Sequence, residues 1–332
     1  MKQIRYGFKA SPVLKNQINN RFALAEEIGL DYFFCELYLD GINICDRRIK
    51  KQIIGHLSAI EGEYPLHVPL IDHQNNLTDP FEVNWSFMDH LAEIGINLSS
   101  PFIILHRCGG FNADIQWEEA EDKYNEWICQ VSKRYPSLTF LIENYGLVFR
   151  KINGSVGFYL SSLDHFFPQE IIRFNDWTTK HSIRNIHPFL DTAHANLTLN
   201  LMKAWDMDQV TAREYIHPSL YTRIDEGVFS LHSIEDYLET GMFPYYHIND
   251  SLSLSNNKAP SLWLDYFMSE GLVPGVGDID WVSFLDKALE NDNEVIMIIE
   301  VGMEDPAKAI EQKKGIEFIQ GLIKKRKQEV SV

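Results

Sequence analysis

Residues 187–197 have the sequence HPFLDTAHANL, and this stretch holds the pattern that decides the fold. An apolar run that is typical of a buried β-strand ends at Asp191, and His194 follows it closely. A carboxylate at the end of a buried run needs a partner, because burying an unpaired charge is costly. The stretch therefore raises the question of what Asp191 faces, and whether other strands end in the same way.

Short apolar or β-rich runs recur along the chain, and longer helix-like segments separate them. The eight runs are 4–10, 32–39, 65–70, 101–108, 139–146, 188–195, 245–250 and 295–302. Between them lie amphipathic segments such as 118–135 and 306–326, in which apolar residues recur at helical spacing. Strands that alternate with helices indicate parallel βαβ units, and eight such units predict an α/β fold of the (β/α)8 TIM-barrel class.

The length of 332 residues is normal for one such barrel. No Gly/Ser/Pro-rich linker divides the chain, so we expect a single domain over residues 1–332. The stretch 197–243 is longer than a simple crossover and predicts extra helices, which could form a lid or an oligomer contact. By analogy with barrels of this type, a homodimer is one expected state.

Composition excludes several function classes. The formal net charge is −17, and the one basic run lies at 324–327, so no nucleic-acid partner is expected. No apolar run approaches the roughly 18 residues of a membrane span, and the start of the chain has no apolar signal segment. The four cysteines have no CxxC spacing and are typical of reduced thiols in a cytoplasmic protein. They are Cys35, Cys45, Cys108 and Cys129.

In six of the eight runs, the apolar segment stops at an acid or a histidine. These six residues are His67, His106, Glu143, Asp191, His247 and Glu300. In a parallel barrel all strand ends meet at one mouth, where such barrels place their active sites. Clustered carboxylates repel one another and raise each other's pKa, and a divalent cation removes that conflict. Three carboxylates and up to three imidazoles therefore predict a metal centre.

Five motifs then follow one another in a characteristic order. They are LIENYG (141–146), LDTAHA (190–195), HIND (247–250), VPGVGDIDW (273–281) and IIEV (298–301). Together they resemble the xylose-isomerase-like TIM-barrel superfamily, which holds sugar isomerases, ketose 3-epimerases, inosose dehydratases and type IV apurinic endonucleases. The resemblance covers about residues 4–320, and its motifs are specific for the superfamily rather than for one member.

The resemblance implies a role for each matching residue. The metal ligands shared across the group match Glu143, Asp191, His247 and Glu300. His194 matches a position that contacts substrate in the epimerases and binds a metal in the endonucleases. His67 and His106 match two histidines that hold an additional zinc in the endonucleases. Asp250 is expected behind the ligands, where it could orient His247, because a ligating imidazole usually donates its other N–H to an acceptor.

The function that we expect is a metal-dependent sugar isomerase or epimerase. Such an enzyme moves a proton beside a carbonyl, and a metal stabilises the enediolate that forms. Glu143 and Glu300 match the two glutamates that exchange this proton in the epimerase branch. The substrate would be a small sugar or sugar phosphate, and Arg107, near a strand end, could bind a phosphate or carboxylate on it.

The number of metal ions decides between this function and its alternatives. An oxygen-rich site with one histidine suits Mn²⁺, Mg²⁺ or Co²⁺, whereas a second ion on His67 and His106 would favour Zn²⁺ or iron. A two-metal phosphodiesterase resembling the type IV endonucleases, or a metal-dependent oxidase, is then the alternative. That endonuclease branch has an Asp-x-His pair after its HxND strand, but residues 251–281 contain no histidine. A third alternative is a barrel that only binds a sugar or a partner.

Overall fold

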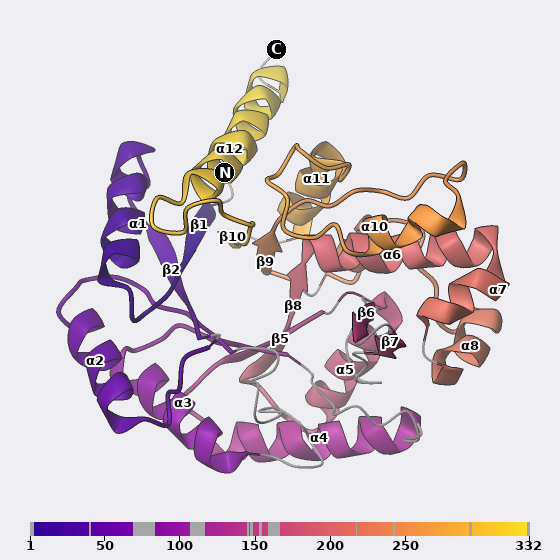
Figure 1. Cartoon of the computed structure of the whole chain (residues 1–332). Coiled ribbons are helices and arrows are strands. Elements are labelled where there is room, and N and C mark those ends of the chain that lie inside the picture. The colour runs from indigo at the N-terminus through magenta and orange to yellow at the C-terminus, as the bar shows by residue number, and fades with distance from the viewer. Residues whose placement is uncertain are drawn as a thin grey trace.

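The computed structural model describes residues 3–39, 41–68, 84–106, 117–144, 146, 149–152, 155–158, 167–216, 218–241, 243–291 and 294–330. Within this part of the chain, eight parallel strands close into a barrel (Figure 1). The strands are β1 (Gln3–Ala10), β2 (Phe33–Tyr38), β3 (Leu66–His67), β4 (Ile103–Leu105), β5 (Phe140–Glu143), β8 (Ile186–Asp191), β9 (Tyr245–Ile248) and β10 (Glu294–Ile299). Each pairs with the next along the chain, and β10 closes on β1. The predicted (β/α)8 barrel is confirmed, and each strand overlaps one of the eight runs.

Helices surround the barrel (Figure 1). The α-helices are α1 (Lys15–Glu27), α2 (Arg47–Leu57), α3 (Trp85–Asn97), α4 (Trp117–Arg134), α5 (Pro168–Lys180), α6 (Thr192–Met207), α7 (Gln209–Ala212), α8 (Pro218–Asp225), α9 (Glu235–Leu238), α10 (Trp263–Phe267), α11 (Trp281–Asn291) and α12 (Ile310–Val330). Two short 3₁₀ turns are η1 (Arg213–Tyr215) and η2 (Pro260–Leu262). The elements α7, η1, α8 and α9 lie within 197–243, so the extra helices predicted there are confirmed.

One pair of strands was not predicted. β6 (Phe149–Ile152) and β7 (Ser155–Phe158) form a two-stranded antiparallel sheet outside the barrel. They lie in the chain between β5 and α5, so they belong to a loop at the carboxyl end of a barrel strand. The barrel's order and closure do not depend on them.

The inside of the barrel has an apolar layer at mid-height. It is one cluster of buried side chains, made of Phe34, Phe102, Ile104, Leu141, Phe189, Ile296 and Ile298. Successive side chains of a strand point to opposite faces, so the next inward position lies two residues further on. The intervening residues, such as Cys35 and Leu190, point outward and pack in the clusters beneath the helices. Because side chains alternate with a period of two, a second layer of inward-pointing side chains lies directly above the apolar one.

A glycine permits the close packing of this interior on β1. A Cβ added to Gly7 would lie 2.7 Å from Ile298 Cγ1 on the neighbouring strand β10. Any side chain at this position would therefore displace part of the apolar layer. The next inward residue of β1, Lys9, rises above the layer and reaches the mouth of the barrel.

Candidate metal centre

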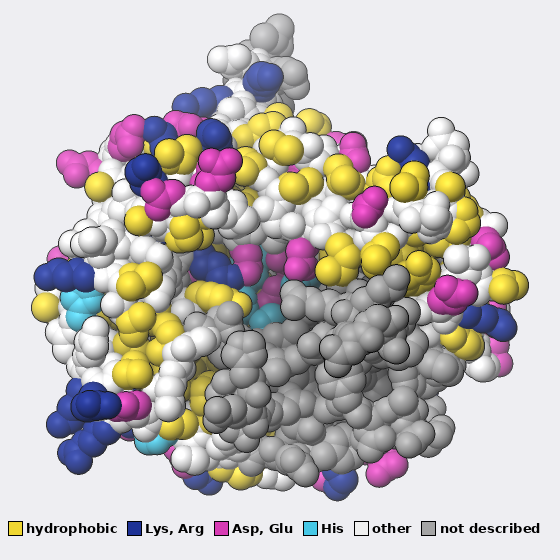
Figure 2. All heavy atoms as spheres, viewed as in Figure 1, with side chains coloured by type: hydrophobic (Ala, Val, Ile, Leu, Met, Phe, Trp, Pro, Cys, Tyr) yellow, Lys and Arg dark blue, Asp and Glu magenta, His cyan; other side chains and the backbone are white. Residues whose placement is uncertain are grey.

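The second inward layer is polar on every strand of the barrel. Each strand carries one acid, histidine or lysine within two residues of its carboxyl end. In strand order these residues are Lys9, Glu36, His67, His106, Glu143, Asp191, His247 and Glu300. The six side chains that the sequence predicted at the mouth therefore come together, with two more that it did not select. Figure 2 shows acidic and histidine side chains at the bottom of a hollow near the centre of this face.

A first group of potential ligands surrounds His247. Glu143, Asp191, His247 and Glu300 each offer one ligand atom, and these atoms all lie within 4.8 Å of one another. His247 Nδ1 lies 2.7 Å from Glu300 Oε2, 3.1 Å from Glu143 Oε1 and 3.8 Å from Asp191 Oδ2. The group could hold one divalent ion through three oxygens and one nitrogen.

A second group shares Glu143 with the first. His67, His106 and Glu143 also bring ligand atoms within 4.8 Å of one another. His67 Nε2 lies 2.8 Å from His106 Nε2 and 3.4 Å from Glu143 Oε2. The two oxygens of Glu143 thus face different groups, so Glu143 could offer one oxygen to each.

The chemistry of these buried groups fits a cation. Glu143 is 1% exposed, and its Oε2 makes no hydrogen bond to any described residue. Burial raises the pKa of Asp191 to about 6, because its charged form has lost its water. Burial opposes the charged form of His247, but neighbouring carboxylates, with Glu300 first, raise its pKa well above the usual value. Protons on Asp191 and His247 therefore offset the charge of the crowded carboxylates, and a cation bound here would replace them.

Glu36 is a member of the site that the sequence did not select. It is fully buried on β2, and its two oxygens lie 2.9 Å from His67 Nδ1 and 2.9 Å from His247 Nε2. Burial opposes its ionisation, but His247 and His67 outweigh that effect and hold its pKa at about 2. The available signal was an acid within FFCELY, since a buried strand rarely carries a charge without a partner.

Two asparagines hold Asp191 in place at the start of α6. Asn144 Oδ1 accepts from the Asp191 backbone N–H at 2.5 Å, and Asn249 Nδ2 donates to Asp191 Oδ2 at 2.6 Å. The Asp191 carboxylate also caps α6, because its Oδ1 accepts from His194 N at 2.8 Å. Asp191 is thus the last residue of β8 and the N-cap of α6, which fixes the direction of its carboxylate.

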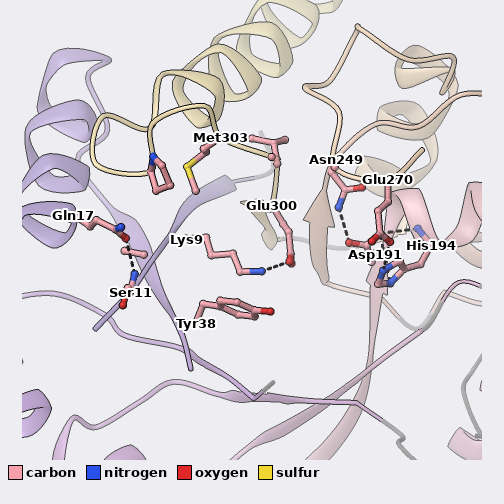
Figure 3. A pocket seen from close by; sticks show the side chains of 15 residues that line it. Lys9, Ser11, Gln17, Tyr38, Asp191, His194, Asn249, Glu270, Glu300 and Met303 are labelled. Atoms are coloured by element: carbon pink, nitrogen blue, oxygen red, sulfur yellow. Dashed lines mark hydrogen bonds and ion pairs between the residues drawn. The ribbon is translucent and has the colours of Figure 1, made fainter. Parts of the chain in front are cut away.

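A cavity of about 510 Å³ opens beside the first group. Lys9, Tyr38 and Glu300 lie on one side of it, and Asp191, Asn249, His194 and Glu270 lie on the other (Figure 3). Lys9 Nζ is paired with Glu300 and lies 3.9 Å from the centre of the Tyr38 ring. His194 Nε2 lies 3.4 Å from Glu270 Oε2. Lys9 and Glu270 had no role predicted from the sequence, and they belong to the site because they line this cavity.

Asp250 has different partners from the expected one. Its two oxygens accept from Gly275 N, Ile279 N and the Trp281 indole N–H at 2.8 to 3.1 Å, and not from His247. The expectation that Asp250 orients His247 is therefore wrong. Asp250 holds the loop VPGVGDIDW instead, and Glu36 faces the His247 nitrogen that Asp250 was expected to bind. The physical reason is the alternation of β9, which places 247 inward and leaves 250 beyond the strand's end.

Other sequence-predicted residues have simpler outcomes. His194 lines the cavity, as a substrate-contacting residue would, and that contact stays a prediction. Arg107 and Cys108 lie outside the described residues. Cys35 is buried, Cys129 is half-buried and Cys45 is exposed. None of the described helices combines the length and the apolar character that crossing a bilayer requires.

Comparison with known proteins gives matches in structure but not in sequence. No family model matches the chain, and no curated protein matches it. A D-tagatose 3-epimerase-like protein aligns over 99% of this chain and 100% of its own, with a TM-score of 0.53 at 15% identity. A xylose isomerase domain protein from Alicyclobacillus acidocaldarius aligns over 97% and 99%, with a TM-score of 0.53 at 12% identity. This chain has the xylose-isomerase-like TIM-barrel fold.

The same fold also occurs in a protein named for a different activity. A family 2 AP endonuclease from Brucella melitensis aligns over 97% of this chain and 99% of its own, with a TM-score of 0.53 at 12% identity. Structures with this fold thus bear the names of epimerases and of endonucleases, and identities this low establish the fold alone. The activity has to be argued from the site.

Proposed function

We propose that this protein is a metal-dependent isomerase or epimerase that acts on a small sugar or a sugar-like polyhydroxy carbonyl compound. The observation that carries the proposal is the first ligand group, Glu143, Asp191, His247 and Glu300, beside a cavity of about 510 Å³. A cavity of this size suits a small molecule. The net charge of −17 makes a polyanionic nucleic acid a poor partner.

The metal ion would be held by the first group, and Mn²⁺, Mg²⁺ or Co²⁺ suits its three oxygens and one nitrogen. When bound, the ion supplies positive charge that stabilises negative charge developing on substrate oxygens. Lys9 would add a second positive charge from the cavity wall. His194 would contact a substrate hydroxyl from the opposite wall, where Asp191 holds the start of α6.

Glu300 and Glu143 are the proposed proton carriers. Glu300 lines the cavity with a side chain that is 27% exposed, so it can reach a substrate hydrogen directly. Glu143 is buried deeper, between the two ligand groups. Of the pair, Glu300 is therefore the better placed to take the first proton.

The test of this function is hydrogen exchange between substrate and solvent. The protein would be incubated with Mn²⁺, Mg²⁺ or Co²⁺ in deuterated water, with ketoses, aldoses and inososes in turn. We expect deuterium incorporation into at least one of them, and its loss in Glu143→Gln and Glu300→Gln while circular dichroism stays unchanged. Incorporation that persists in both variants would contradict the proton-carrier assignment.

A second candidate function is a two-metal hydrolase of phosphoesters, or an oxidase that uses two metal ions. The observation that favours it is the second group, because His67 and His106 both face the Oε2 atom of Glu143. Paired ions activate water and stabilise the leaving group in such hydrolases. Two zinc or iron ions per chain together with hydrolysis of a model phosphodiester would favour this candidate, and one ion with deuterium uptake would favour the first.

A further inference from the structure

Glu36 lies between two histidines that belong to different ligand groups. It is 0% exposed, so its carboxylate is closed off from the solvent. Its Oε1 lies 2.9 Å from His67 Nδ1, and its Oε2 lies 2.9 Å from His247 Nε2. One carboxylate therefore contacts one imidazole of each group.

The opposite nitrogen of each imidazole faces the candidate ligands. His67 Nε2 lies 3.4 Å from Glu143 Oε2 and 2.8 Å from His106 Nε2. His247 Nδ1 lies 3.1 Å from Glu143 Oε1 and 2.7 Å from Glu300 Oε2. Both rings are thus oriented with one nitrogen on Glu36 and the other toward Glu143.

With an ion bound, Glu143 and Glu300 would be its ligands, and Glu36 would be the carboxylate left to accept hydrogen bonds from the two imidazoles. An ionised carboxylate accepts hydrogen bonds and cannot donate one, so each nitrogen that faces Glu36 must carry a hydrogen. A neutral imidazole with its hydrogen on that nitrogen keeps a lone pair on the other one. The lone pairs of His67 Nε2 and His247 Nδ1 are then the ones available to metal ions.

We propose that Glu36 is a positioning residue that selects the ligating nitrogen of two histidines at once, Nε2 of His67 and Nδ1 of His247. It would thereby link the geometry of the two ligand groups from the side opposite Glu143. The inference rests on the metal centre of the proposed function, and it holds for either chemistry.

Glu36 could instead be a ligand itself, since it forms a third group with His67, His247 and Glu300. The distribution of oxygens argues against this role, because oxygens of Glu143, Asp191 and Glu300 lie within 3.8 Å of His247 Nδ1, whereas Nε2 faces Glu36. An ion in that place would have to take the nitrogens that now face Glu36, and both rings would then turn N–H groups toward the Glu143 carboxylate. The two roles predict opposite ligating nitrogens, so they can be told apart.

The first test uses the wild-type protein loaded with Zn²⁺. Long-range ¹H–¹⁵N spectra of its imidazoles distinguish the metal-bound nitrogen from the N–H nitrogen. We expect zinc on Nε2 of His67 or on Nδ1 of His247, with the N–H on the nitrogen that faces Glu36. Zinc on His67 Nδ1 or His247 Nε2 would overturn the inference and leave the metal centre intact. No zinc binding at all would overturn the metal centre and this inference with it.

The second test compares Glu36→Gln with a matched variant, Glu170→Gln. An amide offers one acceptor oxygen and one donor group, so only one of the two imidazoles keeps its acceptor. Glu170 is a buried carboxylate in the first turn of α5, away from the site, where it accepts from Phe167 N. We expect Glu36→Gln to weaken the binding of at least one Co²⁺ about 10–100-fold, with a changed visible spectrum. Wild-type affinity in Glu36→Gln, or an equal loss in Glu170→Gln, would contradict the inference.

Discussion

At the scale of single residues, Glu143 is the side chain that the two ligand groups share. One of its oxygens faces His247, and the other faces His67 and His106. Because the two groups share only this residue, substitutions elsewhere can remove one group and leave the other. Asp191 belongs to the first group alone, and His106 belongs to the second alone.

This separation gives the first prediction. We expect Asp191→Asn to lose the ion of the first group, and with it the deuterium uptake of the proposed isomerase. We expect His106→Asn to keep that ion and most of the uptake, because His106 contributes no ligand to the first group. Metal content per chain, measured by mass spectrometry after dialysis, checks both variants. If His106→Asn abolishes the activity while the first ion stays bound, the two-metal candidate is favoured.

Lys9 leads to the second prediction, because its buried charge has two partners. Its Nζ pairs with Glu300 and lies above the Tyr38 ring, and the cavity opens beside it. If Lys9 stabilises charge on the substrate, Lys9→Met should lower kcat by about 10²-fold with a smaller change in KM. Lys203→Met, which changes a lysine away from the cavity, serves as the control. An unchanged kcat in Lys9→Met would show that Lys9 does not stabilise charge on the substrate.

At the scale of elements, the alternation of each strand decides which side chains reach the mouth. Leu141 lies in the apolar layer and Glu143 lies above it, and Phe189 and Asp191 repeat the pattern on β8. The sequence predicted the strands because their apolar runs are continuous, which is typical of strands covered on both faces. It did not predict the β6–β7 pair, although Asn153-Gly154 between the two strands is a dipeptide that favours hairpin turns.

The loop 273–281 is the second element that shapes the site, and it is held by Asp250. A Cβ at Gly277 would overlap Asp250 Oδ1 and would lie 2.5 Å from the backbone oxygen of Ser251. The glycine is therefore required by the close approach of the loop to this carboxylate. Asp250, the last residue of the HIND motif, therefore fixes the fold of this loop and does not orient a ligand. That is why its expected partner, His247, was wrong.

The third prediction follows from this contact. We expect Gly277→Ala to lower the free energy of unfolding by about 1–3 kcal/mol, since the loop must shift away from Asp250. Gly321→Ala is the matched control, because Gly321 lies inside α12 with no atom near the added Cβ. That change should stabilise the protein by about 0.5–1 kcal/mol. Denaturant unfolding measures both, and equal effects would contradict the role given to the loop.

At the scale of the whole molecule, the barrel brings charged side chains, and the protons that they bind, together at one mouth. Asp191 has a pKa raised to about 6, and the pKa of His247 is raised well above its usual value. Before they can bind a cation, Asp191 must lose its proton and His247 must lose one of its two ring protons. Protons held by the metal-free protein are therefore released on binding, and the metal affinity rises with pH through about 6 and beyond it.

The fourth prediction is this proton release. Titration calorimetry at pH about 7, in two buffers with different ionisation enthalpies, should show net release of protons when Mn²⁺ or Zn²⁺ binds. Metal binding should also raise the unfolding temperature, because ligands that bind only the folded state stabilise it. Asp191→Asn should reduce the proton release and the thermal shift. Enthalpies that are identical in the two buffers would contradict the pKa shifts.

The sequence by itself determined the barrel, because strand and helix periods are local properties that a single chain displays. It also determined that six polar residues end the strands, since the order of the strands alone brings their ends to one face. Only the tertiary structure decided which histidine nitrogen faces which carboxylate oxygen. It also decided that Glu36 and Lys9 complete the polar inward layer, and that Asp250 holds the loop 273–281. Those contacts join residues of different strands, and their distances depend on the closure and register of the barrel, which no local pattern encodes.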